Sequence, residues 1–280
     1  MGVPVDVVEI ASLPKKQMSS DVVEVINPAG SGGFVLVCEH ASSHIPCELK
    51  DLGLSGDVLT SHVAWDPGAL AVAEAMSGEL DAPLVAQRVS RLVYDCNRPP
   101  QAASATPARS EIYAIPGNAG LSPAERERRA ERYYVPFRET LAACIDARLG
   151  RPAAPVVVTI HSFTPVYFGL RRSVDIGILH DADRRLADAM LECAKSEPRS
   201  RFRRNEPYGP LDGVTHTLVE QAMPRGLMNV MIEIRNDLIG SEAEQQEMAA
   251  LLCRLLRGAM DGLTEADRMT EKGADPCKRP

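Results

Sequence analysis

The run Pro155-Val156-Val157-Val158-Thr159-Ile160-His161 is almost continuously apolar and ends in a histidine. Its β-branched side chains favour an extended backbone. Apolar residues that do not alternate with polar ones are typical of a strand buried on both faces of a sheet. The run is also far shorter than the roughly 20 residues needed to cross a bilayer. It therefore predicts an interior strand with a polar group at its carboxyl end.

Similar apolar runs and longer amphipathic segments alternate along the chain. The further strands are expected at 34–38, 83–89, 174–179 and 229–234. The helices are expected at 67–80, 122–149, 182–194, 213–222 and 241–263. Strands that alternate with helices are typical of a layered α/β domain. We therefore expect a three-layer α/β fold, in which a mixed central sheet carries helices on both faces.

The sequence indicates one domain with a long internal loop. The helix at 122–149 has a well-specified start, because Ser122 suits the N-cap, Pro123 the first helical position and Glu125 the third. Residues 98–121 are rich in Pro, Ala, Ser and Gly, and a connection of this length is usually a functional lid or a mobile loop. No linker divides the remainder. We expect a single domain over 20–266, with flexible termini at 1–19 and 267–280.

The composition excludes several classes of protein. The 280 residues are 45% hydrophobic and 25% charged, which indicates a globular chain and not a disordered one. The net charge of −7 at pH 7 offers no attraction for nucleic acid or an anionic membrane. Acidic residues precede the first lysines, unlike a secretory signal, and the seven cysteines form no C-x-x-C pair. We therefore expect a cytoplasmic protein without a disulfide framework or a thiolate zinc site.

Polar residues follow or interrupt several predicted strands, at the edge where open α/β sheets form active sites. Glu39 and His40 follow one strand, His161 ends another, and Glu233 interrupts a third. A carboxylate in an apolar strand costs several kcal/mol unless it is paired or tuned for chemistry. Because imidazoles can hold Zn²⁺ while a carboxylate takes a proton from water, the set predicts metal-assisted hydrolysis. Arg235 shares a strand face with Glu233 and either neutralises that carboxylate or stabilises an oxyanion.

Cationic and amide side chains gather in the region after the second predicted strand. The guanidinium of Arg98 and the amide of Asn97 are suited to bind a substrate carboxylate, a planar group that arginine matches with two hydrogen bonds. Arg91 is a further candidate for this role. The alternative is that Arg91 forms a structural ion pair with Asp95, which would hold the loop.

Four stretches carry a more specific signal. They read EHASSHIP at 39–46, AWDPGA at 64–69, SRLVYDCNRP at 90–99 and TIHSFTP at 159–165. Together they resemble the N-formylglutamate amidohydrolase family, which is related to the zinc carboxypeptidases, and the resemblance spans roughly residues 34 to 237. It implies a zinc-exopeptidase fold of the phosphorylase/hydrolase-like type. Asn97-Arg98, His161-Ser162-Phe163 and Glu233-Ile234-Arg235 also resemble, in the same chain order, the zinc carboxypeptidase group. That resemblance implies that His161 is a zinc ligand, that Asn97 and Arg98 bind a substrate carboxylate, and that Glu233 is the general base.

One position departs from the carboxypeptidase pattern. In that group the first ligand begins an H-x-x-E motif, whereas here the fourth position is Ser43, a poor zinc ligand. Asp66 is the preferred replacement, because it lies in a stretch of the resemblance and a carboxylate would complete a three-ligand site. Glu39 and His44 are competitors. His44 would coordinate the same ion as His40 only if the segment were helical, which the following proline argues against.

These features predict a metal-dependent amidohydrolase. The expected reaction cleaves an N-formyl or other N-acyl amino acid into the amino acid and a carboxylic acid, and the resemblance points to N-formylglutamate. The expected metal is zinc, with another divalent ion as the alternative, and the expected partner is a small substrate with a carboxylate. Two other functions stay open: a zinc carboxypeptidase or peptidoglycan-type amidase acting on larger substrates, and a metal-free, non-catalytic binding protein. An open cleft at loop 99–121 would favour peptides, and a closed one small acyl amino acids.

Overall fold

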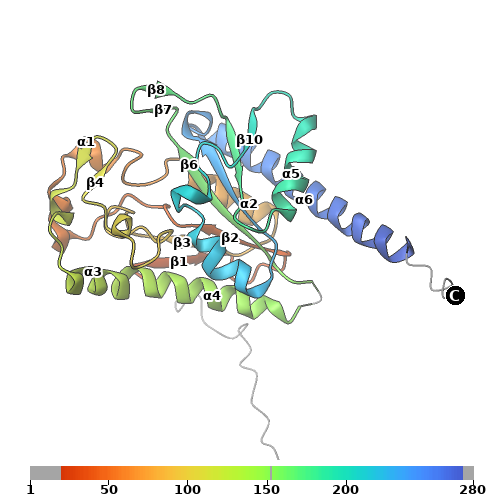
Figure 1. Ribbon diagram of the computed structural model, residues 1–280, viewed down its shortest axis with the longest axis horizontal. Coiled ribbons are helices and arrows are strands. Elements are labelled where there is room, and N and C mark those ends of the chain that lie inside the picture. The colour runs from red at the N-terminus through yellow and green to blue at the C-terminus, as the bar shows by residue number, and fades with distance from the viewer. Residues whose placement is uncertain (1–19, 152, 274–280) are drawn as a thin grey trace, which may run out of the picture.

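A computed structural model describes residues 20–151 and 153–273, with side chains described up to residue 263. At its centre lies a seven-stranded sheet with the strand order β1-β3-β2-β6-β11-β9-β10 (Figure 1). Its strands are β1 Val23–Ile26, β2 Phe34–Cys38, β3 Leu84–Gln87, β6 Val156–Phe163, β9 Ile176–Leu179, β10 Phe202–Arg204 and β11 Asn229–Arg235. Strands β3, β2, β6 and β11 run parallel, whereas β1 and β9 are antiparallel to their neighbours β3 and β11. The sheet is therefore mixed, as the sequence predicted.

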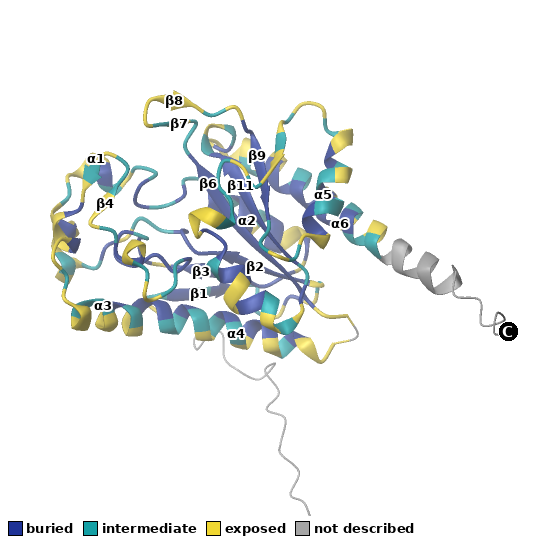
Figure 2. Ribbon diagram, viewed as in Figure 1, coloured by how far each residue is buried: buried dark blue, intermediate teal, exposed yellow. Residues whose placement is uncertain are grey.

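Helices cover both faces of this sheet and produce three layers (Figure 1). The helices are α1 Gly56–Leu59, α2 Ala69–Glu79, α3 Pro123–Arg129, α4 Val135–Leu149, α5 Arg185–Cys193 and α6 Glu242–Gly273. Successive strand residues point to opposite faces. Leu36 accordingly packs in the core that α2, α5 and α6 close, while Val35 and Val37 pack in the core under α4. Burial on both faces explains the continuous apolar runs (Figure 2).

The expected elements agree with the structure except at short or edge segments. All five predicted strands are present, but the edge strands β1 and β10 were not predicted, because they are short and only partly apolar. The helix expected at 213–222 begins later, since Gly213 has a left-handed φ of 66° that ends the preceding turn Pro210–Asp212. Helix α6 continues to Gly273, beyond the expected end at 263 and into a segment expected to be flexible. Residues 1–19 and 274–280 lie outside the described residues.

The start of α3 and the long loop before it are both ordered by side-chain hydrogen bonds. Ser122 and Glu125 form the predicted capping box at the start of α3. Residues 98–121 contain a small hairpin, β4 Arg109–Ser110 with β5 Tyr113–Ala114. Asn118 donates to the carbonyl oxygens of residues 92 and 107 at 2.8 Å each and accepts from Arg129 at 2.6 Å. The loop is therefore tied to the body of the domain through Asn118.

The topology brings several strand ends to one edge of the sheet. Because β2, β3, β6 and β11 are parallel, the segments that follow them emerge side by side. A second hairpin, β7 Val166–Tyr167 with β8 Leu170–Arg171, projects into solvent from the end of β6 (Figure 2). In the described part of the chain, no helix is long and apolar enough to span a membrane.

Candidate functional site

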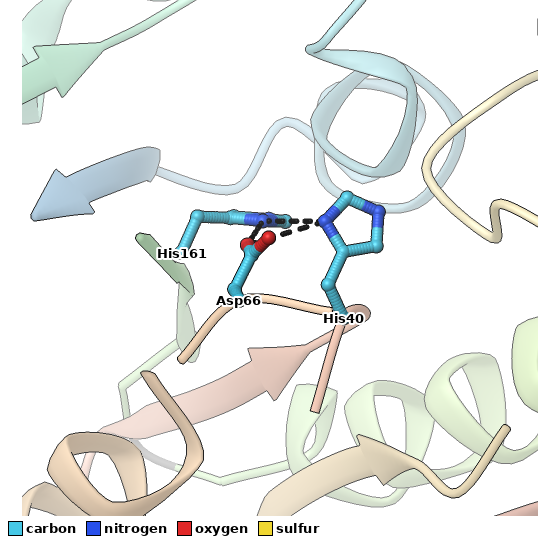
Figure 3. A group of neighbouring side chains, drawn as sticks. All are labelled: His40, Asp66 and His161. Atoms are coloured by element: carbon cyan, nitrogen blue, oxygen red, sulfur yellow. Dashed lines mark hydrogen bonds and ion pairs between the residues drawn. The ribbon is translucent and has the colours of Figure 1, made fainter. Parts of the chain in front are cut away.

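Two imidazole rings and one carboxylate meet at this edge of the sheet (Figure 3). His40 follows β2, His161 lies in β6, and Asp66 lies in the turn that leads into α2. The Nδ1 atoms of His40 and His161 are 3.2 Å apart. Asp66 Oδ2 lies 3.2 Å from Nδ1 of His40 and 2.9 Å from Nδ1 of His161. All three side chains are buried, so three ligand atoms from distant parts of the chain surround one point.

Each ring presents its other nitrogen to a further carboxylate. His40 Nε2 lies 2.8 Å from Asp95 Oδ1, and His161 Nε2 lies 3.1 Å from Glu39 Oε2. Histidines that bind metals usually donate their second ring N–H to such a group, which fixes the ring and leaves the first nitrogen as a lone pair. Two lone pairs that face each other and a carboxylate repel unless a cation lies between them. The arrangement of the rings therefore suits a metal ion.

The distances and charges also fit a divalent metal. Ligand bonds of about 2.0–2.2 Å in a tetrahedral site place the ligand atoms about 3.3–3.6 Å apart, slightly more than the separations of 2.9 to 3.2 Å here. Burial alone would lower the pKa of His161, but the charge of Glu39 and the contact with Asp66 raise it well above its usual value. The surroundings thus favour positive charge at the His161 ring. His40, Asp66 and His161 could hold a metal ion.

Asp66 is the candidate ligand that the structure brings to both rings. Burial alone would raise its pKa, but His40 and His161 hold that pKa well below its usual value, so the carboxylate is ionised. The backbone N–H of Ser162 donates to Asp66 Oδ2 at 3.2 Å and fixes its orientation. Of the two competitors, Glu39 lies behind His161, and His44 lines a different cavity.

Glu233 lies beside the rings on the neighbouring strand. The β11–β6 register pairs Glu233 directly with His161. Its side chain is buried, and its Oε2 has no hydrogen-bond partner among the described residues. Burial raises the pKa of Glu233 to about 7. The carboxyl group can therefore take up and release a proton near neutral pH.

These groups face a cavity of about 490 Å³. Its lining is mostly polar and comes from the strand ends, the 98–121 loop and the β7–β8 hairpin. The lining includes His40, His62, Asp66, Arg91, Asn97, Arg98, Ser110, Glu111, His161, Phe163, Tyr167, Arg172, Tyr208, Asp212 and Glu233. The cavity has the size of ordinary small-molecule sites.

The two predicted arginines after β3 line this cavity and share one carboxylate. Arg91 Nη2 lies 2.8 Å from Asp95 Oδ2, and its Nη1 lies 3.5 Å from Asp66 Oδ1. The structure therefore contains the Arg91–Asp95 ion pair that the sequence left as an alternative. Arg98 donates to the carbonyl oxygen of Gly213, and its Nε lies 3.9 Å from Asp95 Oδ2. Through Asp95, both arginines are tied to the orientation of the His40 ring.

Asn97 lies at the cavity wall, but its amide is already hydrogen-bonded to the backbone. Nδ2 donates to the carbonyl oxygen of Val214, and Oδ1 accepts from the N–H of Thr217 at 3.0 Å. The residue is buried. Asn97 thus anchors the segment before the helical turn at 218–222, and its contacts give it a positioning role beside Arg98.

Arg235 points away from the cavity. Its Nη1 lies 2.6 Å from Asp175 Oδ1, and its Nε lies 2.7 Å from Asp237 Oδ1. It is buried and is not among the residues that line the cavity. Arg235 shares a strand face with Glu233, as predicted, but β9 pairs antiparallel with β11 and brings Asp175 to the end of the strand. The guanidinium is therefore held in an ion-pair network, and its contacts support a structural role.

Several lining residues were not predicted. Arg172 contacts three aromatic rings at the cavity wall, and His62 Nε2 lies 2.9 Å from Glu111 Oε2. Glu39 and Asp95 lie outside the lining, against the outer ring nitrogens of His161 and His40. Arg172, His62 and Glu111 lie on loops or loop ends, where no periodicity distinguishes them. Arg172 directly follows Arg171, which is exposed and outside the lining, so residue type alone could not single it out.

Comparisons with known proteins identify the family to which this chain belongs. The model of the N-formylglutamate amidohydrolase family matches residues 32–240. The structure of gene product Atu2144 from Agrobacterium tumefaciens is 57% identical in sequence, with a TM-score of 0.85 over 87% of this chain and 96% of that one. An N-formylglutamate amidohydrolase from Ralstonia eutropha JMP134 shares the fold, with 20% identity and a TM-score of 0.58 over 87% of this chain and 100% of that one. No curated protein matches the sequence. Because the family model covers well over half of the chain, this protein belongs to the N-formylglutamate amidohydrolase family.

Proposed function

We propose that this protein is a metal-dependent amidohydrolase that cleaves N-formyl or other N-acyl amino acids, such as N-formylglutamate. The observation that carries the proposal is the convergence of His40 Nδ1, His161 Nδ1 and Asp66 Oδ2 beside the unpaired Oε2 of Glu233. Family membership supports the hydrolase class, and the Ralstonia neighbour carries the name of this activity. The reaction consumes one water and yields the amino acid and a carboxylic acid.

The donor set supports zinc as the metal. Two imidazole nitrogens and one carboxylate oxygen are ligands typical of catalytic zinc sites, which use three protein ligands and leave a further position open. When bound, such an ion supplies Lewis-acid polarisation of the scissile carbonyl group. Asp95, hydrogen-bonded to His40 Nε2, holds one ring in the orientation that this requires, and Glu39 lies within ion-pair distance of His161 Nε2.

Glu233 is the residue that we assign to proton transfer. Its Oε2 accepts a proton from the attacking water, whose oxygen forms a bond to the acyl carbon. Glu233 Oε2 then donates that proton to the departing nitrogen as the amide C–N bond breaks. A pKa near 7 suits both steps, because the group is neither fully protonated nor a weak base at neutral pH.

Arg98 is the residue that we assign to the substrate's α-carboxylate. Its guanidinium lines the cavity and is anchored through Gly213 and Asp95, so it offers a fixed positive charge to a planar anion. A substrate held in this way keeps its amide in place for attack, which lowers the entropic cost of the reaction. The ordered 98–121 wall and the cavity volume of about 490 Å³ support a small acyl amino acid over a larger peptide.

The test is hydrolysis by protein of defined metal content. The purified protein is stripped with a chelator, reloaded with zinc and assayed for glutamate release from N-formyl-L-glutamate, with N-acetyl-L-glutamate and a glutamate dipeptide as comparisons. We expect activity in the zinc-loaded protein, loss in the stripped protein, and a preference for the acyl amino acids. If the zinc-loaded protein hydrolyses none of the acyl amino acids, the proposed function is wrong.

A further inference from the structure

Two short hairpins contribute to the cavity wall, and their turns meet. In β4–β5 the two turn residues are Glu111 and Ile112, and in β7–β8 they are Phe168 and Gly169. The backbone N–H of Phe168 donates to Glu111 Oε1 at 3.1 Å, although the two residues are 57 positions apart in the chain. The turn of one hairpin is therefore bonded directly to the turn of the other.

The second oxygen of Glu111 contacts a third segment. Its Oε2 lies 2.9 Å from Nε2 of His62, in the loop between α1 and Asp66. Glu111 and His62 both line the cavity. The Glu111 side chain is only 11% exposed, although it lies at the tip of a surface hairpin. One carboxylate thus joins three segments around the cavity, and we name these two contacts the Glu111 bridge.

The backbone at both turns is unusual for the residues that it carries. Glu111 has a φ of 50° and Phe168 a φ of 47°, both in the left-handed region. Two-residue hairpin turns with a positive φ at this position favour Gly, Asn or Asp, because a larger side chain crowds the backbone. Glu and Phe therefore cost turn stability, and both belong to the bridge. Such costly conformations cluster at functional sites, which indicates that the bridge has a function.

The base of the β7–β8 hairpin is anchored independently of its tip. Arg172 follows β8 and lies in an aromatic cage formed by Phe163, Tyr167 and Tyr208, with its Cζ 4.4 to 5.5 Å from the three ring centroids. Its Nη1 donates to the Tyr208 hydroxyl at 2.8 Å. The backbone N–H of Arg172 also donates to the carbonyl oxygen of Pro165 at 2.8 Å. These contacts fix the base of the hairpin but do not include its turn.

The tip of this hairpin depends on the bridge for its position. Phe168 is 57% exposed and Leu170 is also exposed, so no core holds the turn (Figure 2). Among the described residues, the hydrogen bonds between this turn and other segments are limited to the one with Glu111. Loss of the Glu111 side chain would therefore release the tip while the base stays in place.

The two hairpins form the outer rim of the cavity. Its inner end holds the buried side chains of His40, His161 and Glu233. At the rim, Glu111 lines the cavity, whereas its neighbour in the turn, Ile112, is 59% exposed. The bridge thus lies between solvent and the inner end of the cavity, where it narrows the space through which a long substrate would extend.

We propose that Glu111 is a specificity-determining residue that limits the length of the substrate's acyl group. The inference rests on the proposed function, in which Arg98 binds the α-carboxylate, so that a longer substrate extends from its acyl end. A formyl or acetyl group fits inside the rim. A longer acyl chain, or a further peptide residue, has to displace the bridge, and such a clash is a source of specificity. The reach of the Glu111 side chain, and not its charge, therefore sets the limit.

The test varies the acyl group at a constant amino acid. Glutamate release by the zinc-loaded protein is measured with N-formyl-, N-acetyl- and N-hexanoyl-L-glutamate. We expect wild type to favour the formyl over the hexanoyl derivative by about 100-fold or more in kcat/KM, and Glu111→Ala to reduce this ratio to about 10-fold or less, through faster reaction of the hexanoyl derivative. A wild type that accepts both substrates equally, or an unchanged ratio in Glu111→Ala, overturns the inference.

Two conservative variants separate reach from charge. Glu111→Gln keeps the length of the side chain and an acceptor oxygen for the N–H of Phe168, whereas Glu111→Asp keeps the charge but is shorter by one methylene group. We expect the glutamine variant to retain most of the discrimination and the aspartate variant to behave like Glu111→Ala. The opposite order overturns the inference. Ile112→Ala, which changes the exposed neighbour outside the lining, is the matched control and should keep the full ratio.

Amide exchange tests the bridge without catalysis. The N–H of Phe168 should exchange with solvent several-fold more slowly in wild type and Glu111→Gln than in Glu111→Asp and Glu111→Ala, because a hydrogen bond protects it. Equal rates in all four proteins overturn the inference, and if Glu111→Ala does not fold, the aspartate and glutamine variants decide. Absence of hydrolysis of every acyl amino acid would reject the proposed function, whereas hydrolysis without dependence on acyl length rejects only the role of Glu111.

Discussion

His40 Nε2 lies 2.8 Å from Asp95 Oδ1, and this contact aims the opposite nitrogen of the ring at His161 and Asp66. Asp95 is therefore a positioning residue for the candidate metal site, although it does not touch the common point of the three ligand atoms. Its second oxygen holds Arg91 at 2.8 Å, so one carboxylate sets both the ring and a cavity cation.

Replacing this carboxylate should weaken metal binding without unfolding the protein. In Asp95→Asn the amide can no longer stabilise the ring N–H as a charged acceptor, and we expect zinc affinity to fall by about 10- to 100-fold. A competition titration with a coloured chelator measures the change. Asp188→Asn, which removes a surface carboxylate paired with Arg184, is the control. Unchanged zinc affinity in Asp95→Asn would show that the His40 ring does not need the Asp95 carboxylate to bind zinc.

The ligand assignment can be checked by metal analysis of two histidine variants. His161→Ala removes one of the three converging ligand atoms and should leave the purified protein with little zinc. His44→Ala removes a histidine that lines another cavity and should leave the zinc content unchanged. Full zinc occupancy in His161→Ala would contradict the site, and loss of zinc in His44→Ala would reopen the alternative ligand.

The strand ends explain why much of this site could be predicted from sequence. His161 and Glu233 lie in apolar runs, and parallel strands bring their carboxyl ends to one edge. The register then pairs the two residues directly. Asp66 carries no such signal, because it lies in a turn, and it was expected only through the resemblance. The three layers followed from continuous apolar runs, whose residues enter both cores.

The other parts of the site depend on side-chain contacts that no local sequence pattern encodes. The aromatic cage of Arg172 joins β6, the β7–β8 hairpin and the loop near residue 208, and loop conformations are not set by periodicity. The partner of Arg235 could not be predicted either, because it depends on which strand pairs with β11. Its face was predicted from spacing, but its partner Asp175 depends on the antiparallel neighbour β9, whose direction the apolar run at 174–179 does not reveal.

Glu233→Gln tests the proton-transfer role in isolation from metal binding. The amide keeps the shape of the side chain but cannot accept the proton, so we expect kcat to fall by about 100- to 10,000-fold with zinc content unchanged. Single-turnover formate release together with metal analysis provides the measurement. Glu111→Gln, a conservative change at the same cavity wall, should retain far more activity. Turnover near the wild-type value in Glu233→Gln would remove this residue from the role.

Arg98→Ala tests the anchor for the α-carboxylate. Loss of a charge-assisted contact should raise KM for N-formylglutamate by about 10- to 100-fold, with a smaller effect on kcat. The comparison substrate is the α-amide of N-formylglutamate, which lacks the anion that Arg98 is expected to bind. Its KM should be high in wild type and little changed by the substitution. An unchanged KM for N-formylglutamate in Arg98→Ala would show that Arg98 does not bind the substrate's α-carboxylate.

Asp175 couples the stability of the fold to pH. Burial alone would raise its pKa, but hydrogen bonds from Arg201 and the charge of Arg235 lower it below its usual value. A carboxyl whose pKa is lower in the folded state stabilises the fold above its unfolded pKa of about 3.9, and this contribution is lost as pH falls through the folded pKa. Asp175→Asn should therefore lower the free energy of unfolding by about 1–2 kcal/mol at pH 7. In urea titrations at a series of pH values, the difference from wild type should shrink below about pH 4. A difference that stays constant down to the acid transition would mean that packing around residue 175, and not its charge, supports the end of β11.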